Sequence, residues 1–281
     1  TCKQCSKSSK PGWSVILFPP FQISRGNYVR SDRLIPRVTN ELNSLKLWSA
    51  SDENQMNIVD WREEFNDIRP YSDEELHGVL RRLVQNKWLI AGVQKLRIPW
   101  CPRVLRPFAH RFIRFDLWRS LRRIGSVDEF QRRIIVDRVL ELVVKKTSNG
   151  LSWSGSEHLE RGGAYLYMSN HRDIVLDSAL LNYSLAHSDL DIAEIAFGDN
   201  LLANDFVSDL IRVNKSFIVQ RSLPGRERAR AAHKLSRYIK LTQQHGNPVW
   251  IAQREGRAKD GSDITNPAIL KMLYIEARRG G

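Results

Sequence analysis

Apolar residues recur at helical spacing through the first half of the chain. The segment 73–83 opens with three acidic residues and continues with apolar residues at intervals of three or four. The Ser-Val-Asp-Glu sequence at 126–129 has the form of a capping box, which marks the start of another helix. These patterns predict a mainly helical N-terminal region over residues 35–150. Residues 1–34 mix Lys, Ser, Gly and Pro without sustained periodicity and predict an irregular tail.

After residue 150 short apolar runs alternate with longer segments of helical spacing. Such alternation is typical of strand–helix–strand units, so we predict an α/β fold with a largely parallel sheet flanked by helices. We expect this α/β domain to occupy residues 151–281. The predicted strands lie at 164–168, 192–197, 216–219 and 248–252, and the predicted helices at about 174–186, 199–212 and 225–244.

Charge favours anionic partners. The 281 residues include 44 Lys+Arg and 31 Asp+Glu, which gives a formal net charge of +13. Such a balance suits phosphates, anionic lipid or nucleic acid without choosing among them. Three cysteines are too few for a disulfide framework, so we expect a reducing, cytoplasmic location. No apolar run approaches the roughly 18 residues of a membrane-spanning helix.

A histidine and two carboxylates follow the first predicted strand of the α/β half. His171 comes just after the apolar run 164–168, and Asp173 and Asp177 lie close behind it. Parallel strands deliver such residues to the edge where α/β proteins bind ligands. A histidine there can accept a proton, and a carboxylate on its other ring nitrogen would fix the tautomer. The ordinary alternative is that His171 and Asp173 merely cap the helix.

Two basic motifs come later in the chain. Residues 215–221, Lys-Ser-Phe-Ile-Val-Gln-Arg, read as an apolar strand that ends in a cation. Arg221 has the forked guanidinium that binds phosphate oxygens in pairs. The strand at 248–252 then leads into Glu255-Gly256-Arg257, with Lys259 two residues further on. Each motif alone could be a solvated turn, but a base followed by two phosphate-suited clusters suggests chemistry on a phosphorylated substrate.

The three motifs, in this order, resemble those of the glycerolipid acyltransferases, which include glycerol-3-phosphate and lysophosphatidic acid acyltransferases. The first resembles their His-x4-Asp motif, the second their Gly-x-x-Phe-Ile-x-Arg, and the third their Phe-Pro-Glu-Gly-Thr-Arg. There are departures: a strict His-x4-Asp would place Asp at position 176, which is Leu176. Lys215 stands where the family often has Gly. The resemblance covers roughly residues 150–260.

This resemblance implies a fatty acyl transfer from acyl-CoA or acyl carrier protein to a hydroxyl of glycerol-3-phosphate or lysophosphatidate in phospholipid biosynthesis. His171 would be the general base, with Asp177 favoured and Asp173 open as the carboxylate that orients it. Binding of the acceptor phosphate and hydroxyls would fall to Arg221, Lys215, Glu255, Gly256, Arg257 and Lys259. No metal or redox cofactor and no nucleic acid is implied.

Two further expectations concern the ends of the chain. The family's fourth motif, an apolar segment with Pro, has no convincing counterpart before Gly281, so we expect the α/β domain to be incomplete at its C-terminus. The first residue is Thr1 rather than Met, which favours a fragment or a processed product.

One segment and one rival function stay open. Residues 101–140 contain ten Arg and four acidic residues, 10 − 4 = +6, and Leu105, Phe108, Ala109 and Phe112 share a helical face. Such a helix either packs this face into the core, the ordinary case, or lies on an anionic membrane. The rival function for the whole chain is a non-catalytic basic protein that binds anionic lipid or nucleic acid.

Overall fold

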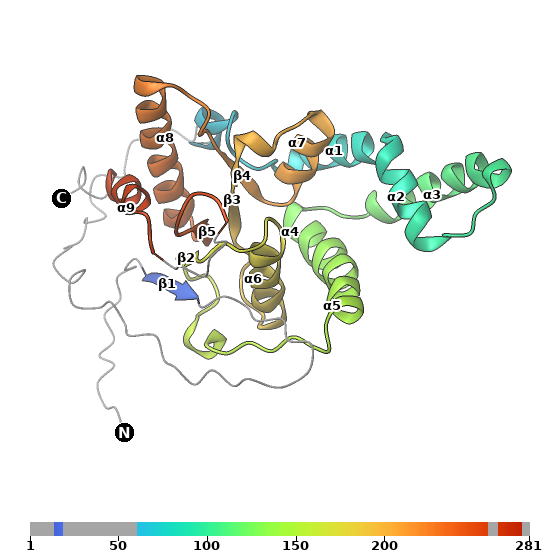
Figure 1. The fold of residues 1–281 in the computed structure, drawn as a ribbon, viewed down its shortest axis with the longest axis horizontal. Coiled ribbons are helices and arrows are strands. Elements are labelled where there is room, and N and C mark those ends of the chain that lie inside the picture. The colour runs from blue at the N-terminus through green and yellow to red at the C-terminus, as the bar shows by residue number, and fades with distance from the viewer. Residues whose placement is uncertain (1–13, 19–60, 258–263, 277–281) are drawn as a thin grey trace.

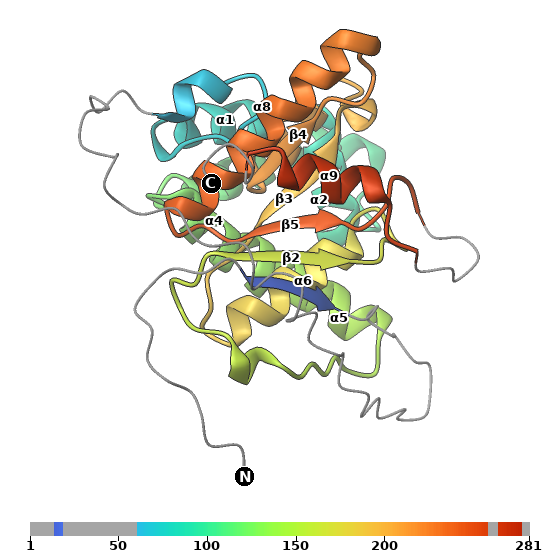
Figure 2. The same cartoon turned by 90° about the vertical axis from the view of Figure 1, so that its left-hand side faces the viewer.

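A computed structural model describes residues 61–257 and 264–276, together with the backbone of residues 14–18. Within these residues the strands form one five-stranded sheet in the order β1-β2-β5-β3-β4, and every pairing is parallel. Figure 2 shows β2 and β5 side by side near the middle of this sheet. The strands are β1 (Ser14–Phe18), β2 (Tyr165–Ser169), β3 (Glu194–Gly198), β4 (Ser216–Val219) and β5 (Val249–Ala252).

Helices cover both faces of the sheet, which confirms the predicted fold class (Figure 1). Side chains alternate along β2, so Tyr167 packs toward α6 (Leu176–His187) while Leu166 and Met168 pack toward α8 (Gly225–Gln244). α9 (Pro267–Tyr274) packs against α8. The core is therefore two apolar layers, one on each side of strands that are buried on both faces.

The strands β2 to β5 lie within two residues of their predicted positions, and α8 has its predicted bounds. The predicted helix at 199–212 is instead a short 3-10 turn, η5 (Asp199–Leu201), followed by α7 (Asp205–Val213). Asn204 caps α7 by accepting a hydrogen bond from the N–H of Val207, so the helix starts there rather than at 199. β1 was not predicted: it lies in the expected irregular tail, whose other residues are outside the described part of the chain.

The described residues before 150 are mainly helical, as predicted. In chain order they form η1 (Trp61–Phe65), α1 (Asp73–Gln85), α2 (Lys87–Arg97), η2 (Arg103–Leu105), α3 (Arg106–Leu121), α4 (Val127–Phe130), the π-helix η3 (Gln131–Leu140) and α5 (Glu141–Thr147). A further 3-10 turn, η4 (Ser156–His158), precedes β2. α1 packs on α7, and η3 packs on α6, so this region abuts the α/β part directly. A domain boundary near residue 150 stays a prediction.

α2 and α3 form a projection at one end of the molecule, on the right of Figure 1. They pack against each other and against α1. The ordinary expectation for α3, an apolar face in the core, is wrong: Leu105, Phe108 and Phe112 are exposed, and only Ala109 is half-buried. Ile113 and Leu121 supply the buried contacts of this helix instead. None of the described helices has the length and apolar character needed to cross a bilayer.

Candidate functional site

His171 and Asp177 meet at the carboxyl end of β2. The imidazole Nδ1 lies 3.1 Å from the Asp177 carboxylate, and both side chains are about four-fifths buried, with 19% and 18% exposed. Asp177 is in the first turn of α6, and its Oδ2 also accepts hydrogen bonds from the backbone N–H groups of Arg172 and Asp173. The carboxylate therefore holds the turn and the ring together. No described residue forms a hydrogen bond with Nε2 of His171.

Asp173 has a different set of contacts. Its Oδ1 accepts hydrogen bonds from the backbone N–H groups of Val175 and Leu176 at the start of α6. These two bonds, followed by the charges of Arg257 and His171, hold the pKa of Asp173 below its ordinary value. Asp173 is thus an ionised cap of the helix start, and no hydrogen bond joins it to the ring of His171. One extra residue in the turn explains why the carboxylate on the ring is Asp177 rather than a residue at position 176.

The ring of His171 also rests on the sheet. Its centroid lies 5.9 Å from that of Trp250 in an edge-to-face arrangement, and the indole N–H of Trp250 donates to the hydroxyl of Ser169. Trp250 is buried on β5, next to β2 in the sheet. The sequence pattern placed Trp250 in a strand but gave no signal for this contact, because it depends on the pairing of β2 with β5.

Arg221 follows β4 at the same edge of the sheet. Gly198 ends β3 beside Val219 of β4, and a Cβ at Gly198 would lie 3.7 Å from the guanidinium carbon of Arg221. The same Cβ would lie 2.5 Å from the side-chain oxygen of Asn200, too close for that side chain to stay in place. Gly198 thus leaves room for the side chain of Asn200, and the guanidinium of Arg221 packs beside this glycine at ordinary contact distance. The packing role of Gly198 could not be predicted from the three motifs, because this residue lies outside all of them.

The third motif adds a cation on the side of His171. Arg257 lies close enough to Asp173 for its charge to lower that carboxyl's pKa. Gly256 has φ +73°, a left-handed conformation that glycine adopts without strain. Glu255 and Arg257 are exposed. Lys259, the last residue predicted for this cluster, lies outside the described residues.

Lys215 is not part of this arrangement. It precedes β4 and so lies at the opposite, amino end of the strand from Arg221. Its ammonium group is 2.7 Å from Asp128 and also donates to the carbonyl of Ile192. The side chain is nearly buried, so Lys215 ties the helical region to the sheet. The structure therefore gives no support to the predicted contact between Lys215 and the substrate. The reason is the direction of β4, which places Lys215 and Arg221 at opposite ends of the strand.

The sheet itself separates the two halves of the candidate site. β3 and β5 pair only at Glu194–Val249 and Ile195–Trp250, whereas β2 and β5 stay paired to their last residues. The described ladder between β3 and β5 therefore ends before the carboxyl edge. His171 lies beyond β2 on one side of this break, and Arg221 lies beyond β4 on the other. Ligands of open α/β sheets bind outside the carboxyl ends of the strands, at such separations.

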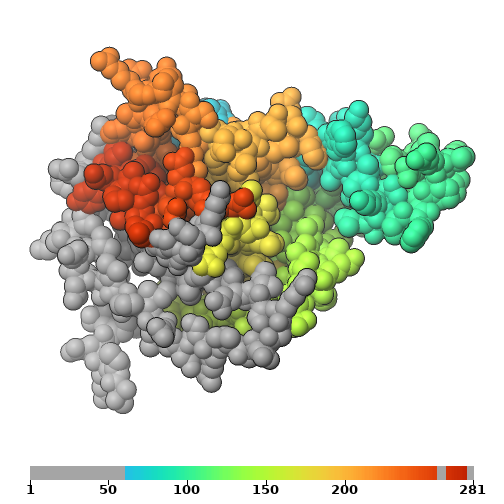
Figure 3. Space-filling view, viewed as in Figure 1, coloured from blue at the N-terminus to red at the C-terminus, as the bar shows by residue number. Residues whose placement is uncertain are grey.

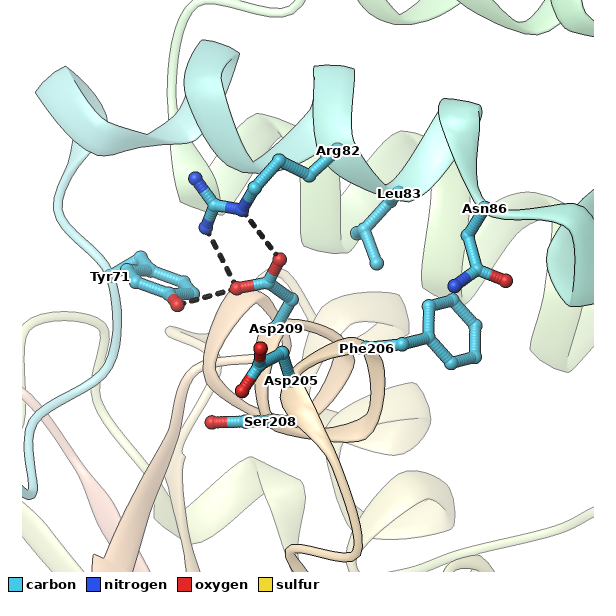
Figure 4. A pocket seen from close by; sticks show the side chains of 8 residues that line it. All are labelled: Tyr71, Arg82, Leu83, Asn86, Asp205, Phe206, Ser208 and Asp209. Atoms are coloured by element: carbon cyan, nitrogen blue, oxygen red, sulfur yellow. Dashed lines mark hydrogen bonds and ion pairs between the residues drawn. The ribbon is translucent and has the colours of Figure 1, made fainter.

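A second polar cluster lies elsewhere, between α1 and α7 (Figure 4). Asp209 accepts two hydrogen bonds from the guanidinium of Arg82, at 2.8 and 2.7 Å, and one from the hydroxyl of Tyr71, at 2.6 Å. A cavity of about 400 Å³ lies beside it. The charged and phenolic groups bond to one another, which is the arrangement of a structural junction. The residues described contain no group of three His, Cys, Asp or Glu that could hold a metal ion.

Comparison with known families matches the α/β part. The model of the family described as Acyltransferase matches residues 151–268, from just before η4 to the start of α9. The matched stretch contains His171, Asp177, Arg221 and Arg257, and it leaves out the helices before residue 150. The match supports acyltransferase activity in general. No curated protein matches the chain.

Proposed function

From the acyltransferase match, we propose that this protein transfers a fatty acyl group from a thioester, acyl-CoA or acyl carrier protein, to a hydroxyl of glycerol-3-phosphate or lysophosphatidate, a step of phospholipid biosynthesis. The observation that carries the proposal is the 3.1 Å contact between Nδ1 of His171 and Asp177 at the carboxyl edge of the sheet. It leaves Nε2 as the nitrogen that can accept a proton. No metal or redox cofactor is part of the proposal.

The chemistry follows from this geometry. Asp177 accepts a hydrogen bond from Nδ1–H of His171, so the neutral ring keeps its lone pair on Nε2. Nε2 accepts the acceptor's hydroxyl proton while the hydroxyl oxygen bonds to the thioester carbonyl carbon. The carbon–sulfur bond then breaks, and the imidazolium returns its proton to the departing thiolate. The carboxylate stays ionised and stabilises the transient imidazolium, and no nucleophile from the protein is needed.

Phosphate recognition is proposed for the cations at the same edge. Arg221 can pair its guanidinium with two phosphate oxygens, and Arg257 adds charge near Asp173. Glu255, Gly256 and Lys259 remain proposed contacts of the acceptor. A phosphate between these cations would bring the acceptor hydroxyl toward His171 across the break between β3 and β5.

The experiment is a thioester-release assay with each acceptor in turn. We expect release of free thiol that depends on an acceptor, together with an acylated glycerol phosphate identified by mass spectrometry. Glycerol without phosphate is the matched control and should support little transfer. Thiol release that yields only free fatty acid, or none with either acceptor, would contradict the proposal.

A further inference from the structure

Exposed large apolar side chains are concentrated on the projection formed by α2, η2 and α3. Nine of them lie between residues 88 and 115, whereas the other described residues contribute eight in total. Trp100 is 93% exposed, Val104 82% and Phe108 73%. The nine are Trp88, Leu96, Ile98, Trp100, Val104, Leu105, Phe108, Phe112 and Phe115. Monomeric proteins rarely expose apolar side chains in such a group without a partner for them.

The apolar residues of α3 form a stripe on its outer side. Phe108, Phe112 and Phe115 recur at intervals of four and three, so they share one face, and the exposed Val104 of η2 precedes them. Ile113, which is buried, lies on the opposite face. The helix is thus attached through one side and presents aromatic rings on the other. Figure 3 shows α2 and the start of α3 standing out from the body at the right of the view.

The positive charge of the same segment favours an anionic partner. Residues 87–115 contain seven Lys or Arg and no Asp or Glu. Two of the seven have partners: Arg97 pairs with Asp116, and Arg114 donates to the carbonyl of Val84. The other five form no hydrogen bond or ion pair within the part of the chain that the structure describes, and all are exposed: Lys87, Lys95, Arg103, Arg106 and Arg111.

We propose that the α2–α3 projection docks onto an anionic lipid bilayer. Phe rings and Trp side chains would enter the interface, where amphipathic aromatic rings are favoured, and the unpaired cations would contact lipid phosphates. A protein partner of acidic character is the competing occupant. The bilayer fits better because aromatic and cationic residues alternate along the segment instead of forming separate patches. The inference does not depend on the proposed acyl transfer.

The test is co-flotation of the full chain with vesicles. One set contains only phosphatidylcholine, and the other contains phosphatidylcholine with about one-third phosphatidylglycerol. We expect binding to the anionic vesicles to be at least tenfold stronger and to weaken as salt is raised, because the charge contribution is screened. Binding should be measured without acyl donor or acceptor, so that its failure is distinct from a failure of catalysis.

Two substitutions locate the contact. Trp100→Ser and Phe108→Ser change exposed side chains, so the fold should survive, and each should weaken binding to anionic vesicles by about tenfold. Val139→Ser is the matched control, since Val139 is exposed on η3, away from the projection. Arg106→Gln should weaken binding and reduce its salt dependence, whereas Arg138→Gln should do neither.

Three results would overturn the proposal. The first is a folded protein that floats with neither vesicle. The second is binding that is unchanged by the substitutions at Trp100 and Phe108. The third is self-association of the free chain that Trp100→Ser abolishes while vesicle binding persists, which would assign the projection to contact between two copies.

Discussion

Asp177 and Asp209 each accept three hydrogen bonds, but their surroundings differ. Asp209 is buried, whereas Asp177 is mostly buried, with 18% of its side chain exposed. Asp209 is bonded to an arginine and a tyrosine whose polar groups are directed at it, between two packed helices. Asp177 is bonded to two loop amides and to a histidine whose second ring nitrogen has no partner among the described residues. The closed cluster can only stabilise the fold. The cluster around Asp177 leaves one reactive atom available, as a site of proton transfer requires.

The largest effect is expected at His171. His171→Ala should lower the acyl-transfer rate by roughly 10²–10⁴-fold, because a general base contributes about that much. The fold should persist, since His171 lies in the turn after β2 and belongs to none of the buried apolar clusters of the sheet. Turnover and the thermal unfolding midpoint should be measured together. His77→Ala is the matched control, because His77 is exposed on α1; near-normal turnover in folded His171→Ala would show that the base lies elsewhere.

The two carboxylates near His171 should differ in the same assay. Asp177→Asn should lower the rate by about 10²-fold or more, because an amide can present its N–H to Nδ1 and so favour the wrong ring tautomer. Asp173→Asn should cost far less activity, since Asp173 contacts only the start of α6. Equal losses in the two variants would mean that the turn as a whole, and not the contact with the ring, matters for activity.

Substitution of Arg221 should weaken binding of the phosphorylated acceptor. Arg221→Ala removes a charge-assisted hydrogen bond worth about 1.5–3 kcal/mol, so the KM for the phosphorylated acceptor should rise roughly ten- to a hundredfold. The KM for the acyl donor should change much less. Arg221→Lys should restore only part of the loss, because an ammonium group lacks the fork of a guanidinium.

Lys215→Met provides the contrast for Arg221. It should lower the unfolding midpoint by removing the contacts with Asp128 and Ile192, while the acceptor KM stays the same. Steady-state kinetics with each substrate varied separately, alongside thermal unfolding, would separate the two cations. An acceptor KM that rises for Lys215→Met but not for Arg221→Ala would reverse their assignments.

Asp209 should affect stability alone. Asp209→Asn should lower the free energy of unfolding by about 1–3 kcal/mol, as it leaves Arg82 and Tyr71 with a poorer acceptor. Arg82 is 56% exposed and can recover hydration, so the loss should stay below that of a fully buried pair. Denaturant unfolding measures this loss, and the KM values should be unchanged. A kinetic defect without a loss of stability would mean that the α1–α7 junction takes part in catalysis.

The smallest effect concerns alkaline pH. Burial, then the hydrogen bond to Asp209, raises the pKa of Tyr71 to about 12. The unfolded chain would ionise this phenol near pH 10, so the stability that Tyr71 contributes is present below pH 10 and is lost between about pH 10 and 12. Tyr71→Phe should lose less stability over that interval than the unaltered protein. Parallel curves for the two proteins would contradict the role given to this hydrogen bond.

The sequence predicted most of the α/β architecture because each strand and helix there carries its own periodicity. β1 was not predicted because this strand forms by pairing with β2, and the local sequence pattern carries no information about that pairing. Similarly, the motifs predicted that His171 and Arg221 follow strands, but the parallel sheet order was needed to bring them to one edge. Lys215 was assigned to the site because it begins the second motif, although a strand separates it from Arg221 at the motif's end.

The exposed face of α3 shows the same limit. Helical spacing identified Leu105, Phe108 and Phe112 as one face, but spacing alone does not say what covers it. In the structure α1 and α2 meet α3 on its other side. Whether an apolar face is core or surface is decided by the position of neighbouring helices, which is tertiary information.

The central claim is that His171 and Asp177 act as one unit. A double-mutant cycle tests it most directly: turnover is measured for His171→Ala, Asp177→Asn and the double variant, each shown to be folded. If Asp177 acts only through the ring of His171, the double variant should be no slower than His171→Ala alone. Losses that multiply in the double variant would show that the two residues act independently, and would contradict the account.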